Sequence, residues 1–332
     1  MLRYALRRLS FLPIILIAVS IFTFVLLRVL PTGDIADVIG GSNATAEQKQ
    51  QIRERYGLND PIFPVSFSAS GSIIELNRHS QYGDWLTKAM RGNFGTTFTS
   101  QKSVRTEFVR RFPASFEIVA LSLFFSVFFG IIFGVLSAMY RNSKIDYVVR
   151  IFAVLGTSIP EFFLLTLLII IPSYLWNYSP PVGGYVPIYD DPARNLRLFL
   201  PAALVIGIGG SSGLMRLVRT TMLEVLRSDY VRTAKAKGLQ QRTVIMTHAL
   251  RNAGTPILTA IGTAFIAVFG GSVIVEKILS IDGIGLFFFT ETFTRDLPVI
   301  QFLAVYTAAV VMLVNLVVDL SYASVDPRVK YS

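Results

Sequence analysis

Six stretches of this 332-residue chain are apolar over a length that can cross a membrane as a helix. A spanning helix needs about 20 mostly apolar residues. Only 16% of the residues are charged, whereas soluble domains carry about 25%. The predicted spans cover roughly residues 9–30, 115–139, 148–176, 198–217, 257–275 and 299–322. We therefore predict an all-α membrane protein with six transmembrane helices.

The first apolar run follows Arg3, Arg7 and Arg8, as the hydrophobic part of a signal peptide would. Its apolar part is too long for a signal peptide, and no small-x-small cleavage site precedes Pro31. The sequence thus predicts an uncleaved anchor helix over residues 1–31. The third run contains Pro160 and Pro172, which interrupt its helical pattern.

Basic residues predict which loops stay in the cytoplasm. If the N-terminus is inside, the inner segments hold sixteen Lys and Arg residues but only four acidic ones. The two short outer loops hold four basic residues between them. Because Lys- and Arg-rich loops are retained on the cytoplasmic side, we predict that both termini are cytoplasmic. The net charge of +10 then reflects topology, and no nucleic-acid partner is expected.

The long outer segment, residues 32–113, is not low in complexity. Thr45 can cap a short surface helix that ends at Gly57, and a glycine-rich turn follows at residues 92–95. The remaining predicted divisions are a core domain over residues 114–323, with an inner loop at 218–253, and a cytoplasmic tail at 324–332. We expect the outer segment to form a small ordered cap.

Several kinds of chemistry are excluded by what the chain lacks. It has no cysteine and only two histidines, so a Cys- or His-based metal site is not expected. It has no G-x-x-x-x-G-K-[ST] loop, so it cannot cradle ATP phosphates. The sequence GGSSG at 209–213 matches a serine-nucleophile pattern, but it lies inside a predicted span. Close helix packing explains these small residues better.

The inner loop contains a well-specified short helix, predicted from Tyr230 to Lys237. Asp229 can cap its start, and Gly238 suits the left-handed position after its end. Ala234 and Ala236 keep its middle slim, so that another protein could approach closely. A second helical run, RTVIMTHALRNA, leads to the fifth span. Two interpretations remain open from the residues alone: a solvated loop beside lipid headgroups, and a docking element for a cytoplasmic partner.

The residues of this loop resemble the coupling loop of binding-protein-dependent ABC transporter permeases, within the dipeptide, oligopeptide and nickel group. The resemblance is carried by EVLRSDYVRTAKAKGLQQRTVIMTHALRNAGTPIL, MRLVRTTMLEVL, VEKILSIDGIG and NLVVDLSYASVDPRVKYS. RYGLNDPI, RGNFGTTF and RFPASFEI are similar to the outer loop and second span of the B-type subunit. One departure is Lys235-Ala236-Lys237, preceded by Ala234, where the general consensus has Glu-Ala-Ala.

This resemblance implies a type I importer permease (MetI-like) fold in a bacterial or archaeal plasma (inner) membrane. It implies a homologous second permease subunit, two ATP-binding subunits (or one fused chain) and an extracytoplasmic solute-binding protein. No cofactor is expected on this chain, because ATP and Mg²⁺ belong to the partner subunits. The loop helix would lie in a groove of an ATPase. The implied coupling residues are Glu224, Asp229, Tyr230, Arg232, Thr233, Ala234, Lys235, Ala236, Lys237, Gly238 and Leu239.

The predicted function is therefore that of a pathway subunit without catalytic residues, with peptides as the expected cargo. Nickel chelates, glutathione-like molecules and oligosaccharides remain alternatives. Pro160 and Glu161 are the candidates for the translocation path, because the proline frees backbone carbonyls beside an acidic group within a predicted span. The alternative role of Glu161 is a bond within the helix bundle. A secondary transporter would show inverted repeats and paired midplane charges, and the sequence shows neither. A membrane-embedded enzyme would need a catalytic triad, which the residues do not offer.

Overall fold

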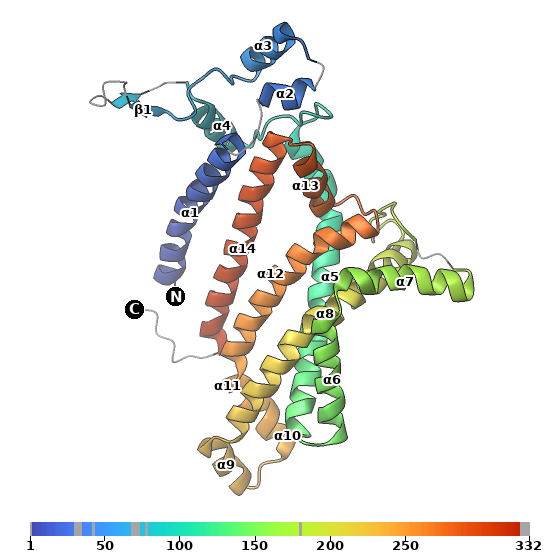
Figure 1. Cartoon of the computed structure of the whole chain (residues 1–332). Coiled ribbons are helices and arrows are strands. Elements are labelled where there is room, and N and C mark those ends of the chain that lie inside the picture. Colours follow the sequence, from blue (N-terminus) through green and yellow to red (C-terminus); the bar gives the residue numbers. More distant parts are fainter. Residues whose placement is uncertain are drawn as a thin grey trace. The chain divides into compact units, whose positions relative to one another are not determined.

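The computed structural model describes residues 2–29, 35–41, 44–67, 74–76, 79–178 and 181–325. The chain divides into two compact units (Figure 1). The first contains Met1–Leu9, Arg111–Leu286 and Val311–Ser332, and the second contains Ser10–Arg110 and Phe287–Val310. The predicted motif Asp326-Pro327-Arg328 lies outside the described residues.

The described elements are helical apart from one short antiparallel hairpin. They are α1 (Leu2–Val29), α2 (Ile35–Gly40), α3 (Ala46–Arg55), β1 (Val65–Phe67), β2 (Ile74–Leu76), α4 (Gln81–Met90), α5 (Val104–Met139), α6 (Lys144–Ser158), α7 (Glu161–Trp176), α8 (Pro192–Leu226), α9 (Asp229–Ala236), α10 (Gln241–Thr243), the π-helix η1 (Val244–Ala249), α11 (Leu250–Asn252), α12 (Gly254–Ile278), α13 (Ile284–Phe293) and α14 (Leu297–Val325).

Five described helices are long and apolar enough to cross a membrane. They are Leu9–Arg28, Val104–Met139, Pro192–Leu226, Gly254–Ile278 and Leu297–Tyr322. Five of the six predicted spans are thus present as continuous helices. The second begins earlier than expected, at Val104, so the predicted boundary at residues 113/114 lies inside α5. Glu107, whose carboxylate lies 3.1 Å from Arg110, belongs to this additional polar stretch.

The third predicted span is not one straight helix. α6 and α7 meet at an angle of 96°. The described helices therefore give the predicted total of six spans only if this bent pair is counted as one span. The cause is Pro160, which precedes α7. A proline disfavours helical geometry at the residue before it, and Ile159 accordingly adopts an extended conformation with φ −95° and ψ 121°.

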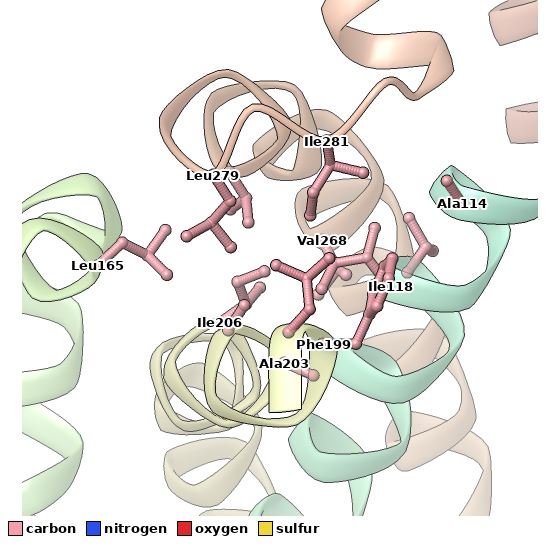
Figure 2. Packing of buried hydrophobic residues seen from close by; sticks show 13 residues of the cluster. Ala114, Ile118, Leu165, Phe199, Ala203, Ile206, Val268, Leu279 and Ile281 are labelled. Atoms are coloured by element: carbon pink, nitrogen blue, oxygen red, sulfur yellow. The ribbon is translucent and has the colours of Figure 1, made fainter. Parts of the chain in front are cut away.

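The core of the first unit lies where α5, α7, α8 and α12 meet. Figure 2 shows apolar side chains from these helices and from the turn after α12 gathered around one centre. Its members are Ala114, Ile118, Val119, Leu165, Leu198, Phe199, Ala202, Ala203, Ile206, Val268, Val275, Leu279 and Ile281. Packing of this kind holds membrane helices together through close contact, since lipid tails are as apolar as the core.

Small residues allow α8 to approach its neighbours closely. A Cβ atom added to Gly130 of α5 would lie 2.6 Å from Leu214, and one added to Gly156 of α6 would lie 2.1 Å from Ser212. Ser211 and Ser212 donate their hydroxyls to Ile208 O, at 2.7 and 3.2 Å. The GGSSG stretch is therefore a packing segment, as the sequence predicted.

The second unit contains the outer segment up to Arg110, and aromatic and capping contacts order its described part. Thr45 and Gln48 form a capping box at the start of α3, and Gly57 has a φ of +63°. Ser20 and Tyr82 share a hydrogen bond of 2.8 Å, and Gln301 donates to Ser20 O at 2.8 Å. The predicted surface helix is thus confirmed.

Candidate functional site

α9, the helix of the inner loop, starts one residue earlier than the sequence predicted. The amides of Val231 and Arg232 donate to Ser228 O, at 3.1 and 3.2 Å. Asp229 is therefore the first helical residue and not the cap, which corrects the prediction. Its carboxylate still lies in the first turn, where the helix dipole favours negative charge. It is 97% exposed and 3.5 Å from Arg232.

The end of α9 has the geometry that the sequence predicted. Gly238 has a φ of +79°, which is left-handed backbone. Leu239 N donates to Ala234 O at 3.4 Å, and Lys237 N donates to Thr233 O at 3.1 Å. This bond from Leu239 back across five residues is the mark of a Schellman motif. A Cβ on Gly238 would meet nothing within 4 Å, so the backbone alone requires glycine here.

The inner face of α9 packs on its own chain. Val231, Ala234 and Val244 form a buried cluster, with Val225 and Leu226 against it. The prediction that Ala234 offers a slim surface to another protein is therefore wrong, because this side chain is only 9% exposed and faces η1. The hydrophobic pattern of an amphipathic helix accounts for this, since positions three apart share a face.

The outer face of α9 is exposed. The exposed predicted coupling residues are Glu224, Asp229, Tyr230, Arg232, Thr233, Ala236, Lys237, Gly238 and Leu239. The side chain of Lys235 lies outside the described residues. The described part of this face mixes charged groups with two apolar side chains, Tyr230 at 45% and Leu239 at 42% exposure. Such a mixed, protruding surface can be recognised by another protein.

The predicted return run forms one continuous helical segment from α10 through η1 to α11, with π geometry in its middle. Val244 of η1 belongs to the buried cluster of α9, while Ile245 and Ala249 belong to an apolar cluster that includes Leu214, Val218 and Met222 of α8. π segments are rare and often mark functional positions. Through these two clusters, α9 is joined to the C-terminal part of α8 by apolar packing.

A polar cluster that the sequence analysis did not identify lies further back along α8. Asp146 is fully buried and accepts hydrogen bonds from Ser137 Oγ (2.5 Å) and Asn142 N (3.0 Å). Arg219 of α8 donates to the same carboxylate. Ser143, which caps α6 three residues before Asp146, was a sequence signal for the helix start. Nothing in the sequence pointed to Arg219 as the partner.

A second missed carboxylate lies near the C-terminal end of α12. Glu276 is fully buried, accepts a hydrogen bond from Ser115 Oγ at 2.6 Å and accepts another from Leu286 N at 2.8 Å. Ser115 Oγ in turn accepts from Ile284 N at 2.7 Å. The VEKILSIDGIG stretch is thus a turn folded around its own glutamate and joined to α5.

The predicted path residues lie at the break between α6 and α7. Pro160 is the last non-helical residue, and Glu161 begins α7. Glu161 is half-buried, and its carboxylate lies beside Gly209 of α8 and Gly271 of α12. The structure thus brings three helices of the first unit together around this acid.

Comparisons with known proteins agree with this architecture. Residues 130–331 match the family described as "Binding-protein-dependent transport system inner membrane component", and residues 1–119 match the N-terminal domain of such membrane components. The oligopeptide transport system permease protein AppB of Bacillus subtilis is 34% identical over 335 residues, covering 100% of both chains. The probable peptide ABC transporter permease protein y4tP of Sinorhizobium fredii is 36% identical, covering 99% of each.

A solved structure is also similar. A chain of the inward-facing MetNI methionine ABC transporter is 19% identical and covers 66% of this chain and 95% of that one, with a TM-score of 0.48. The family matches together span nearly all of the sequence. The chain belongs to the family of inner membrane components of binding-protein-dependent transport systems.

Proposed function

We propose that this chain is the permease subunit of an ATP-driven peptide importer. Two relatives that match over essentially their full length, AppB and y4tP, are named as oligopeptide and peptide permeases. The single observation that carries the proposal is α9: a capped helix whose inner face packs on η1 and whose outer face is exposed. The chain supplies the path and the coupling lever, and separate subunits supply ATP hydrolysis.

The proposed partners are a homologous permease, two ATP-binding subunits (or one fused chain) and a solute-binding protein outside. The exposed side chains of α9 would lie in a groove of the ATPase. When ATP draws the two ATPase subunits together, each α9 would move with them. Because α9 is packed through Val244 onto the segment that contacts α8, that movement would reach the spans. Hydrolysis would then reset them.

The proposed orientation places both termini and the 218–253 loop in the cytoplasm. The excess of basic residues in the inner segments supports it. In this arrangement residues 1–31 anchor the chain, 32–113 lie outside, 114–323 form the core and 324–332 form the tail. A cytoplasm-active reporter fused after Ser332 is expected to be active, and one inserted near Ser70 is expected to report the outside. Signals from one compartment at both positions would refute this topology.

The decisive experiment is reconstitution. The chain purified alone is expected to hydrolyse no ATP, whereas the complex that co-purifies with it should contain ATPase subunits. In proteoliposomes, that complex should import a labelled oligopeptide only when ATP and peptide-loaded binding protein are both present. A complex that hydrolyses ATP in response to another loaded binding protein but imports no peptide would refute the substrate class. ATP hydrolysis by the pure chain would refute the subunit assignment.

A further inference from the structure

Glu161 is a carboxylate within the bent apolar pair of α6 and α7, and no described residue forms a hydrogen bond or an ion pair with it. It stands at the 96° bend between α6 and α7, directly after Pro160. The two fully buried acids among the described residues of the first unit are different. Asp146 is held by Arg219 and Ser137, and Glu276 is held by Ser115 and a backbone amide.

The neighbours of Glu161 give its carboxylate room. A Cβ added to Gly209 would lie 3.1 Å from Oε1 and 3.4 Å from Cγ of Glu161. A Cβ added to Gly271 would lie 3.1 Å from Oε2. The two distances of 3.1 Å are tighter than ordinary contacts of a Cβ atom. Two glycines on two different helices therefore leave space at the two oxygens, yet neither contributes a side-chain donor.

An acidic group in this position is costly unless it meets a positive charge. Charged side chains within spanning segments are rare and mark pathways or pairing sites. The dipole of α7 offsets part of this cost, because Glu161 lies in the first turn of that helix. A cation that arrives from outside the chain would supply the missing partner.

We propose that Glu161 is a transient counter-charge for the cationic group of the transported substrate, which for a peptide is its protonated amino terminus. This inference rests on the proposed function, since every unblocked peptide carries such an ammonium group near neutral pH. A moving ammonium group loses its water as it passes a constriction, and a charge-assisted hydrogen bond to a carboxylate replaces part of that hydration. Glu161 thereby favours passage of peptides with a free amino terminus.

The test compares one labelled oligopeptide with its N-acetylated form, which lacks the cation. Both are loaded to saturation on the binding protein, as measured by titration, and offered to the complete complex in proteoliposomes. Glu161→Gln keeps the size of the side chain and removes its charge. This variant is expected to slow uptake of the free peptide about tenfold and to leave uptake of the acetylated peptide unchanged.

Matched variants separate charge from architecture. Glu117→Gln removes a second half-buried carboxylate, on α5, which interacts with Tyr185. In this variant the uptake rates of the free and the acetylated peptide should change by the same factor. Gly209→Ala should displace the Glu161 carboxylate and slow the free peptide selectively. The Cβ atom that Gly213→Ala adds on the same helix would meet nothing within 4 Å, so this variant should behave as wild type.

Three results would overturn the inference. They are wild-type uptake of both peptides by Glu161→Gln, equal slowing of both peptides, and a lower yield of complex with normal uptake per assembled complex. Any of these would leave peptide import by the wild-type complex intact, so only the role of Glu161 would be lost. If the wild-type complex imports neither peptide, the proposed function fails and the inference fails with it.

Discussion

Arg219 holds Asp146 by two parallel hydrogen bonds, from Nε to Oδ1 at 2.8 Å and from Nη2 to Oδ2 at 3.0 Å. The two residues are 73 positions apart, and Asp146 has no exposed surface. Ser137 and Asn142 donate to the same carboxylate. The pair therefore fastens the turn between α5 and α6 to the part of α8 that leads into α9. Bidentate pairs of this kind fix orientation as well as distance.

Removing Arg219 should destabilise the protein strongly. Arg219→Ala removes both guanidinium hydrogen bonds from the buried Asp146 carboxylate and leaves only the more distant Arg150, whose Nε lies 3.6 Å from Oδ1. Breaking a buried pair costs about 3–5 kcal/mol. We expect a clear fall in the thermal midpoint of the purified complex. Arg216→Ala is the matched control, because Arg216 is exposed on the same helix. Equal midpoints for the two variants would show that the pair contributes nothing to stability.

Several local features of the chain could be predicted from the sequence. Left-handed backbone at Gly238 follows from the glycine that ends the Asp229–Lys237 stretch, and the Thr45 cap follows from its spacing to Gln48. These features depend on neighbours in the chain. The break at Pro160 was visible as an interruption, but the 96° angle was not, because the packing of α7 against α8 and α12 sets it.

The long-range features could not be predicted. Asp146 and Arg219, or Ser115 and Glu276, come together only because distant helices pack side by side, and neither pair has a spacing that marks it. The inner face of α9 was misjudged for a similar reason. In the sequence, an alanine at position 234 is compatible with a docking surface and with a buried contact. Only the packing of Val244 beside it shows that the contact is buried.

Gly283 should tolerate no side chain. A Cβ atom there would lie 2.4 Å from the carboxyl of Glu276 and 2.5 Å from Ser115 Oγ. Gly283→Ala must therefore push apart the turn that these two residues hold, and overpacking costs typically about 1–3 kcal/mol. We expect a lower thermal midpoint. Gly270→Ala in α12 meets nothing within 4 Å and should not lower it; an equal drop in both variants would contradict the crowding argument.

The second unit should lose stability as pH rises. Burial raises the pKa of Asp296 to about 6, although the amides of Phe98 and Thr99 favour the ionised form. Since this pKa lies above the usual value of 3.8, the folded state binds the proton more tightly than the unfolded state. Its contribution is present below about pH 4 and is lost as pH rises through about 6.

Asp296→Asn should therefore flatten part of the pH dependence between pH 4.5 and 7. The midpoint of wild-type unfolding is expected to fall by about 2–4 °C over this interval, and the variant should lose that fall. Hydrogen exchange at the amides of Phe98 and Thr99 reports the same region directly. Asp60→Asn, at an exposed position of the same unit, should keep the wild-type profile. A profile unchanged by Asp296→Asn would show that another group titrates.

The two alanines of α9 allow stability and coupling to be separated. Ala234 is buried against Val231 and Val244, whereas Ala236 is exposed. Ala234→Glu places an unpaired charge in an apolar contact of the chain with itself, at a cost of several kcal/mol, so α9 should detach from η1. Ala236→Glu adds the same charge to the outer face. It should leave folding and the thermal midpoint of the isolated chain unchanged, because no described side chain covers that position.

In the assembled complex the two variants should fail for different reasons. Ala236→Glu should reduce pull-down of the ATPase subunits or the stimulation of ATP hydrolysis by loaded binding protein, since its charge and bulk would lie at the proposed contact. Ala234→Glu should reduce uptake while the complex still binds some ATPase subunit. The reason is that a helix α9 that no longer packs on Val244 would transmit less movement to α8. Normal hydrolysis, uptake and pull-down in Ala236→Glu would mean that the outer face of α9 touches no partner at this position, and the coupling role proposed for it would be lost.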